Sequence, residues 1–313
     1  MKGHRVVFIT GLALIAVCVL DLSGCAVLTT SQVQEVKRFS EATKAYTELP
    51  GALARSYGVL VRDSALLALS RREFSPNDTA KATEAWDKIV QAYEAEQKLS
   101  AAGERMDGAL AVLTDYSQIL SQLVADEYTD ELGESSAKLG SSMNGAIDAY
   151  NKTYRANKPL PSVGGDIAAA IRAAGGLYVR YRQATILKET TEKANPLIHG
   201  LMGDVKMIAD NMAADFEASE TTHVRDPFKQ VANESRRLAV TTFGAVYEDL
   251  ARARAGKALA KKVGDAATAY AAAHQALVDK TRQRMDLKEV IAEIQTLGRE
   301  VKAAKDLKAK VEK

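Results

Sequence analysis

The chain is predicted to adopt an all-α fold, an elongated antiparallel bundle of long helices with coiled-coil-like packing. Three observations predict it. Proline is rare, with six in 313 residues, and aromatic residues make up only 6% of the chain. Alanine, lysine, glutamate, leucine and arginine dominate, which is typical of long helices. Apolar residues recur at steps of three, four and seven over long stretches, the spacing that places them on one helix face.

The N-terminal segment, residues 1–24, is predicted to be a signal peptide. Lys2, His4 and Arg5 provide a short basic start, and residues 6–20 form an uncharged apolar run. A run of this length is typical of a secretory signal, and it is shorter than the roughly 20 residues that a membrane span needs.

A motif of two small residues and a cysteine, Leu22-Ser23-Gly24-Cys25, ends the apolar run. It resembles the lipobox of bacterial lipoproteins, L-[AS]-[GA]-C, at all four positions. The resemblance implies cleavage after Gly24 and lipidation of Cys25 with palmitate-containing lipid, which would anchor the mature protein in a membrane. Asp21 departs from the usual apolar flank. An uncleaved anchor or an ordinary signal peptide is the alternative.

The predicted organisation follows from this motif. Residues 1–24 are the signal peptide, 25–31 a lipidated tether and 32–313 a helical bundle domain. The bundle has two candidate halves, 32–157 and 162–313, because weakly similar segments suggest an internal duplication.

Location and charge limit the partners. By the sorting rule of enterobacterial lipoproteins, the absence of an aspartate after Cys25 implies the outer membrane, with the domain facing the periplasm.

Cys18 leaves with the signal peptide, so no disulfide is expected. Removing residues 1–24 leaves 40 basic residues against 39 acidic ones. This balance argues against nucleic acid as a partner.

The first helix is predicted over residues 32–72, with a break at Leu49, because Pro50 removes a backbone donor and clashes one turn back. The second is predicted over residues 75–125, where Ser75 can cap its first turn. Its packing face is expected to consist of leucine and methionine that recur every seven residues, Leu99, Met106, Leu113 and Leu120. Trp86 and Tyr93 are expected to extend this seam upstream.

The central region carries the strongest break. Residues 126–136 predict either a turn or a solvated stretch of helix, and the third helix then continues to about Asn157. Residues 158–162, KPLPS, end it, because two prolines with one residue between them cannot continue a helix. The fourth helix is expected over residues 162–218, with glycine pairs that allow close helix packing and with Pro196 as a bend.

Residues 219–226 are polar and predict a turn, followed by an Asp-Pro pair that caps the fifth helix. That helix is expected to run through Leu238, Phe243, Val246 and Leu250, with an interruption at Gly256 or Gly264. A last helical region is predicted from about Ala266 to the C-terminus. Its apolar stripe consists of Leu287, Val290, Ile294, Leu297, Val301, Ala304 and Val311.

No catalytic, metal or cofactor site is predicted. His199, His223 and His274 lie far apart, lack the spacing of metal ligands, and are interpreted as surface or flanking residues. No nucleophile motif and no glycine-rich loop after a strand is present. A basic cluster is interpreted as a solvated helix face, with lipid headgroups as the alternative: Arg252, Arg254, Lys257, Lys261 and Lys262.

The sequence therefore predicts a non-enzymatic, membrane-anchored lipoprotein that acts as a periplasmic helical scaffold, spacer or partner-binding protein, with another envelope protein as its partner. The final Lys313 resembles the lysine by which the Braun lipoprotein is joined to peptidoglycan, but the Val-Glu-Lys ending departs from that pattern. Peptidoglycan is therefore kept as a possible partner, but a covalent link to it is not expected. The alternative is a membrane-active bundle resembling haemolysin E-like toxins, with residues 163–179 as the inserting segment. Asp166 and Arg172 weigh against it, because each costs about 2.5–3.5 kcal/mol at a bilayer centre.

Overall fold

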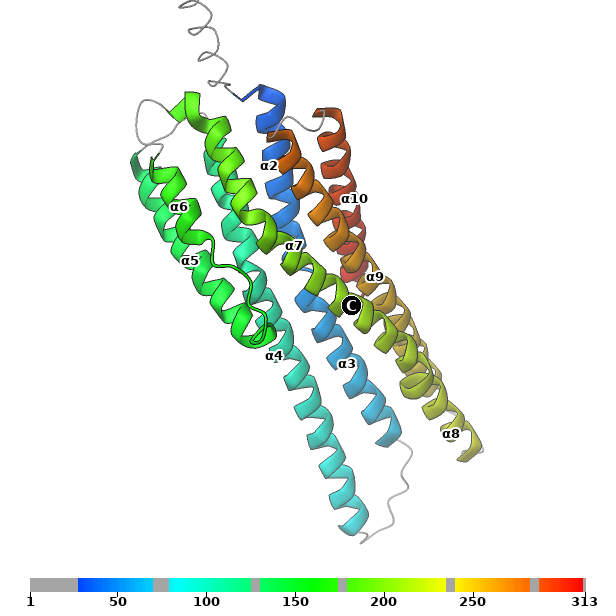
Figure 1. Ribbon diagram of the computed structural model, residues 1–313. Helices are drawn as coiled ribbons and strands as arrows, with labels where there is room; N and C mark the ends of the chain where they lie inside the picture. The colour runs from blue at the N-terminus through cyan, green and yellow to red at the C-terminus, as the bar shows by residue number, and fades with distance from the viewer. Residues whose placement is uncertain are drawn as a thin grey trace, which may run out of the picture.

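The computed structural model describes residues 28–69, 79–124, 130–173, 179–234, 240–281 and 287–311. These residues form helices with no strand among them, which confirms the all-α class. Figure 1 shows the helices side by side along one long direction. In chain order they are α2 (Thr30–Tyr46), α3 (Pro50–Leu69), α4 (Thr79–Leu123), α5 (Asp130–Tyr154), α6 (Gly164–Ala173), α7 (Val179–Ser219), the π-helix η3 (Glu220–Arg225), α8 (Asp226–Glu234), α9 (Val240–Thr281) and α10 (Leu287–Val311).

The bundle has two distinct ends. At the proximal end α2 begins, α9 ends and α10 begins. At the distal end α3 ends, α4 begins, and η3 and α8 join α7 to α9 (Figure 1). The predicted anchor, Cys25, lies outside the described residues but only three positions before Leu28, the first of them. The proximal end is therefore the one that a lipid on Cys25 would hold near a membrane.

The predicted break before Pro50 is confirmed. α2 ends at Tyr46, and α3 begins at Pro50 after three non-helical residues. A proline fits the first position of a helix, where its missing N–H would have no intrahelical partner. At the start of α2, the Thr29 side chain accepts from the Gln32 backbone, and the Gln32 side chain accepts from the Thr29 N–H at 2.8 Å. This capping box fixes where the helix starts.

The seam of α4 differs from its prediction upstream of Leu99. Trp86 is 63% exposed and Tyr93 is 59% exposed, so neither extends the seam. The buried residues at this spacing are instead Ala85 and Ala92, one position earlier. α3 lies close to α4 at Leu99, because a Cβ at Gly58 would approach the Leu99 Cβ to 3.2 Å. Upstream of Leu99, alanines occupy the buried positions and the large rings are exposed.

The proline-rich segment leaves the helical pattern, as predicted. α5 ends at Tyr154, and the chain is non-helical until α6 begins at Gly164. Asn151 pins this segment by donating to the Leu160 carbonyl at 2.9 Å and accepting from the Leu160 N–H at 2.6 Å. A Cβ at Gly164 would collide with the Gly140 carbonyl oxygen, so the close packing predicted for glycine pairs holds at this position.

The turn predicted over residues 219–226 is wrong. The chain continues from α7 through η3 into α8, and Val224, which is 3% exposed, holds η3 against the bundle. Asp226 has helical backbone angles, φ −69° and ψ −40°, so it does not start a new helix as a cap. The polar side chains that suggested a turn lie on helical residues. Here α7 continues into the π-helix η3, whose backbone hydrogen bonds join residues i and i+5.

The expected interruption at Gly256 or Gly264 is wrong, and so is the expected start of the last helix at about Ala266. α9 is continuous through both glycines to Thr281, and α10 begins at Leu287. Gly256 lies against the Phe216 ring of α7, where a Cβ would collide with it, so this glycine serves helix packing and not a turn. The α10 stripe is confirmed, since six of its seven predicted members are buried: Val290, Ile294, Leu297, Val301, Ala304 and Val311.

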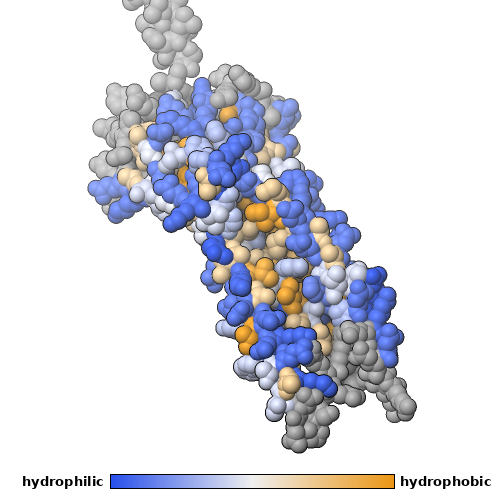
Figure 2. All heavy atoms as spheres, turned by 60° about the horizontal axis from the view of Figure 1, so that its bottom comes forward, coloured by the Kyte–Doolittle hydropathy of each residue, from blue (hydrophilic) through white to orange (hydrophobic). Residues whose placement is uncertain are grey.

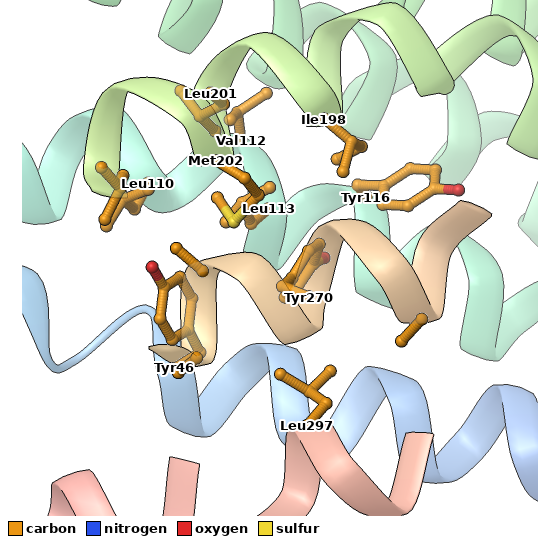
Figure 3. Packing of buried hydrophobic residues seen from close by; sticks show 14 of the residues in the cluster. Tyr46, Leu110, Val112, Leu113, Tyr116, Ile198, Leu201, Met202, Tyr270 and Leu297 are labelled. Atoms are coloured by element: carbon orange, nitrogen blue, oxygen red, sulfur yellow. The ribbon is translucent and has the colours of Figure 1, made fainter. Parts of the chain in front are cut away.

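A single cluster of buried apolar residues connects these helices. Figure 3 shows its centre, where rings from α2, α4 and α9 meet. Tyr46, Tyr116 and Tyr270 are fully buried, and the Tyr46 and Tyr270 rings lie 5.8 Å apart between centroids. Aromatic rings at such separations add attraction beyond the area that they bury.

Candidate functional site

The proximal half contains a buried polar chain around His274. Tyr116 on α4 lies 2.7 Å from His274 Nε2 on α9, and His274 Nδ1 lies 3.0 Å from Asn195 Oδ1 on α7. Both hydrogen bonds of this ring are satisfied when Nδ1 carries the proton, so that Nδ1 donates to Asn195 while Nε2 accepts from the tyrosine hydroxyl. Burial, followed by the nearby charge of His199, lowers the pKa of His274 to about 3. The imidazole is therefore neutral at physiological pH.

The polar chain reaches the surface through two further residues. Asn195 Nδ2 donates to Gln275 Oε1 at 3.0 Å, and His199 Nε2 lies 3.2 Å from the same oxygen. His199 is exposed, as predicted, but the interpretation of His274 as a surface or flanking residue is wrong, because its exposed fraction is 0%. The chain links α4, α7 and α9 and contains no activated nucleophile.

The distal half uses charged groups instead. Arg62 on α3 pairs with Glu96 on α4 at 2.8 Å, and Arg252 on α9 pairs with Asp63 on α3 at 2.5 Å. Arg252 also approaches Asp249 at 3.2 Å. Burial, together with the negative charge of Asp63, raises the pKa of Asp249 to about 6. These pairs connect α3, α4 and α9.

The basic cluster on α9 is largely paired with carboxylates. Lys257 contacts Glu217 at 2.6 Å, Arg254 contacts Glu220 at 2.8 Å, and Lys262 contacts Glu300 at 2.8 Å. With Arg252 paired as described, Lys261 is the exposed member for which the structure gives no ion pair within the described residues. The pairing favours a structural role for this cluster over binding of lipid headgroups.

One serine–histidine contact lies at the distal end. Ser64 Oγ on α3 is 3.0 Å from His223 Nδ1 on η3, and burial lowers the pKa of His223. Such a pair is the first element of a nucleophilic site. Ser64, however, is 5% exposed and lies within a helix, so its hydroxyl is not presented to a substrate. The contact joins η3 to α3.

Large exposed hydrophobic side chains concentrate in the distal half. Of the eight among the described residues, six lie there: Leu66, Trp86, Ile89, Tyr93, Phe243 and Tyr247. Phe243, predicted to lie on the fifth helix, is on α9 and is 51% exposed. Figure 2, which brings the distal end forward, shows hydrophobic residues gathered in a band between hydrophilic margins.

Trp86, Ile89 and Tyr93 follow one another at steps of three and four on α4, so they share one helix face. We name this face the α4 stripe. A second exposed pair, Phe243 and Tyr247, lies one helical turn apart on α9. A patch of this kind marks an interaction surface more often than a scattered exposed residue does.

A pocket of about 460 Å³ lies where η3 and α8 meet α9. Val224, Phe228, Val246 and Leu250 line its apolar part. The Phe228 and Phe243 rings pack 5.9 Å apart beside it. Charged side chains of both signs form its rim, including Glu217 and Lys257, which neutralise each other. The pocket adds apolar surface to the same distal region.

Among the described residues, no group of three or more histidine, cysteine, aspartate or glutamate side chains is placed to hold a metal ion. Across that same part of the chain, no helix combines the length and apolar character that a bilayer crossing requires. Within residues 163–179, the described portion includes α6, where Ile167 and Ile171 are buried.

No protein-family model, curated protein or solved structure matches this chain.

Sequence reasoning missed the buried polar chain and the exposed rings. A signal for the first was present, because His274 is preceded by three alanines, 271–273, and followed by Ala276, the small residues of a tightly packed helix. The α4 stripe had a weaker signal. Residues 85 and 92 repeat at the same spacing as residues 86 and 93, so the spacing alone does not decide which pair is buried.

Proposed function

We propose that this protein is a non-enzymatic, outer-membrane lipoprotein, anchored through Cys25, whose helical bundle presents its distal half to another protein in the periplasm. The observation that carries the proposal is the position of the exposed rings. They concentrate at the end of the bundle opposite to α2, which the Leu22-Ser23-Gly24-Cys25 motif would tether to the membrane.

The tether length supports this arrangement. Thr30, the first residue of α2, comes five residue steps after Cys25. A fully extended chain covers at most about 3.6 Å per residue, so the proximal end would stay within about 18 Å of the lipid. α4 alone has 45 residues, which span about 68 Å at 1.5 Å each. The distal surface would thus stand well clear of the membrane.

Anchoring is tested with Cys25→Ser. The expected result is loss of palmitate incorporation and release of the protein from the membrane fraction, because the serine hydroxyl cannot accept the lipid in place of the thiol. Undiminished palmitate labelling in the variant would contradict the lipid anchor.

Partner binding is tested by photocrosslinking in cells. A photoreactive amino acid is placed at Trp86, Tyr93 or Tyr247, and at Met207 as the control, since Met207 is 56% exposed but lies outside the distal cluster. The same discrete crosslinked protein is expected from the three distal positions and not from Met207. Equal crosslinking at Met207, or none at the distal positions, would overturn the proposal.

A further inference from the structure

A groove of about 380 Å³ runs between α2 and α10 on the proximal half of the bundle. Its floor is apolar and consists of Ala42, Ala45, Ile294 and Val301. Ile294 and Val301 belong to the core stripe of α10, while Ala42 and Ala45 are partly buried against the core. The groove thus exposes the edge of the hydrophobic core in place of a polar surface.

The rim of the groove is predominantly cationic. Arg38, Lys302 and Lys305 line it, against a single carboxylate, Glu41. Lys302 and Lys305 are exposed, and they lie one turn apart on α10. Arg38 extends from α2, where it also pairs with Glu35 at 2.8 Å. A groove with an apolar floor and a net positive rim is complementary to a binding partner that has an apolar face and acidic flanks.

The dimensions of the groove favour a helix as its occupant. Along α10 it extends over 11 residue steps, from Ile294 to Lys305, which is about 16 Å or three turns. Gly298 lies in the middle, and a Cβ there would meet no atom within 4 Å. The missing side chain leaves a notch that can receive a large side chain from a third helix packed against α2 and α10.

We propose that the α2–α10 groove is the docking site for an acidic amphipathic helix of a partner protein. Apolar residues at i, i+3 or i+4, and i+7 would contact the floor and the Gly298 notch, and glutamate or aspartate flanks would face Lys302, Lys305 and Arg38. This is the helix-in-groove mode of peptide recognition. The groove lies apart from the distal surface, so this inference does not depend on the proposed function.

The test uses the mature full chain carrying Cys25→Ser and a designed fluorescent peptide of about four turns with a leucine stripe and glutamate flanks. A peptide with the same leucine stripe and lysine flanks is the comparison. The glutamate peptide is expected to bind at least 10-fold more tightly than the lysine peptide, and added salt should weaken its binding. Because Trp86 is the sole tryptophan of the chain and lies on the distal α4 stripe, its emission should not change on binding.

Two variants locate the binding in the groove. The double variant Lys302→Glu and Lys305→Glu should weaken the glutamate peptide about 10-fold, because two attractions become repulsions. Gly298→Leu should weaken it similarly by filling the notch, without loss of fold. The matched controls are Lys288→Glu, an exposed charge elsewhere on α10, and Gly203→Leu, at a site on α7 that is equally open. Neither control should change the affinity.

Three results would overturn the inference. They are the absence of binding, equal binding of both peptides, and binding that neither groove variant weakens. The protein is also mixed with phosphatidylglycerol vesicles and with neutral vesicles. If the anionic vesicles bind through Lys302 and Lys305 while the glutamate peptide does not, the groove faces lipid and not a helix. A change in Trp86 emission with the peptide would place the contact on the distal half and equally refute the assignment.

Discussion

The proximal and distal halves of the bundle differ in their most deeply buried polar contacts. In the proximal half, neutral groups meet in the buried chain from Tyr116 through His274 to Asn195. In the distal half, ion pairs such as Arg62 with Glu96 and Arg252 with Asp63 connect the helices and remain partly exposed. The ion pair of Lys262 with Glu300, between α9 and α10, is likewise partly exposed. Neutral hydrogen bonds tolerate full burial, whereas charges need solvent or a partner.

Five rings are among the largest fully buried side chains: Tyr46, Tyr116, Tyr270, Phe39 and Phe216. Four of them come from α2, α4 and α9, whereas Phe216 lies near the distal end of α7 and packs against Tyr57 of α3 at 5.2 Å between ring centroids. The distal half thus has a buried ring of its own. It differs from the proximal half in the large rings that it also leaves exposed: Trp86, Tyr93, Phe243 and Tyr247.

The largest expected effect is that of shortening a core leucine. Leu113→Ala, at a position with 0% exposure, should lower the free energy of unfolding by about 2–5 kcal/mol, since it removes buried contacts and leaves a cavity. Leu66→Ala in the distal half, at a side chain 42% exposed, should change it by about 0.5 kcal/mol or less. Urea denaturation of both variants checks this, and similar losses would refute the contrast between the halves.

The next prediction concerns acid. The pKa of His274 is about 3 in the folded protein, against about 6.5 when unfolded. The unfolded chain therefore binds more protons between these values, and stability falls as the pH drops below about 6.5. At pH 5 this group alone removes about 2 kcal/mol relative to pH 8. Chemical denaturation at several pH values measures the slope.

His274→Gln is the control for that slope. Glutamine can still accept from Tyr116 and donate to Asn195, but it does not titrate. The variant should be less stable than the parent at pH 8 because the ring packing is lost, and its stability should depend less on pH between 5 and 7. An unchanged slope would mean that His274 is not the group that titrates on unfolding.

Asp249 should produce a smaller effect of the opposite sign. Its pKa of about 6 in the folded protein exceeds the value of about 3.9 for an unfolded aspartate. The folded state then binds more protons between these values, so this group reduces stability as the pH rises from about 4 to 6. Asp249→Asn should therefore raise the unfolding free energy at pH 8 by about 1 kcal/mol, with little effect at pH 4. Destabilisation at pH 8 would show that the contact with Arg252 outweighs the burial.

Features that depend on local sequence could be predicted. The break before Pro50, the non-helical segment around Pro159 and Pro161, and the apolar stripe of α10 follow from backbone sterics and periodicity, which act within a few residues. Cys25 stays a prediction, because it lies outside the described residues. Its motif is likewise local, since a peptidase reads a short stretch of chain.

Features that depend on the distance between helices could not be predicted. Ala85 is buried and Trp86 next to it is 63% exposed, an outcome that depends on how the neighbouring helices are placed and not on the heptad itself. The burial of His274 likewise depends on Tyr116 and Asn195, which come from two other helices. Periodicity identifies a face, but only packing decides which of two adjacent faces is covered.

The smallest expected effect is spectroscopic and tests the exposure of the distal half directly. Trp86, the single tryptophan of the chain, is 63% exposed. Its emission maximum should shift only slightly on unfolding in urea, and acrylamide should quench it efficiently in the folded protein, because water and quencher already reach the ring. The comparison is Phe39→Trp combined with Trp86→Phe, which moves the reporter to a position with 0% exposure. That protein should emit at shorter wavelength, resist acrylamide, and shift markedly on unfolding.

A native Trp86 that behaves like the buried reporter would mean that another surface covers the α4 stripe in solution. The concentration dependence of the quenching then identifies that surface, since shielding by a second copy of the chain disappears on dilution, whereas shielding within one chain does not.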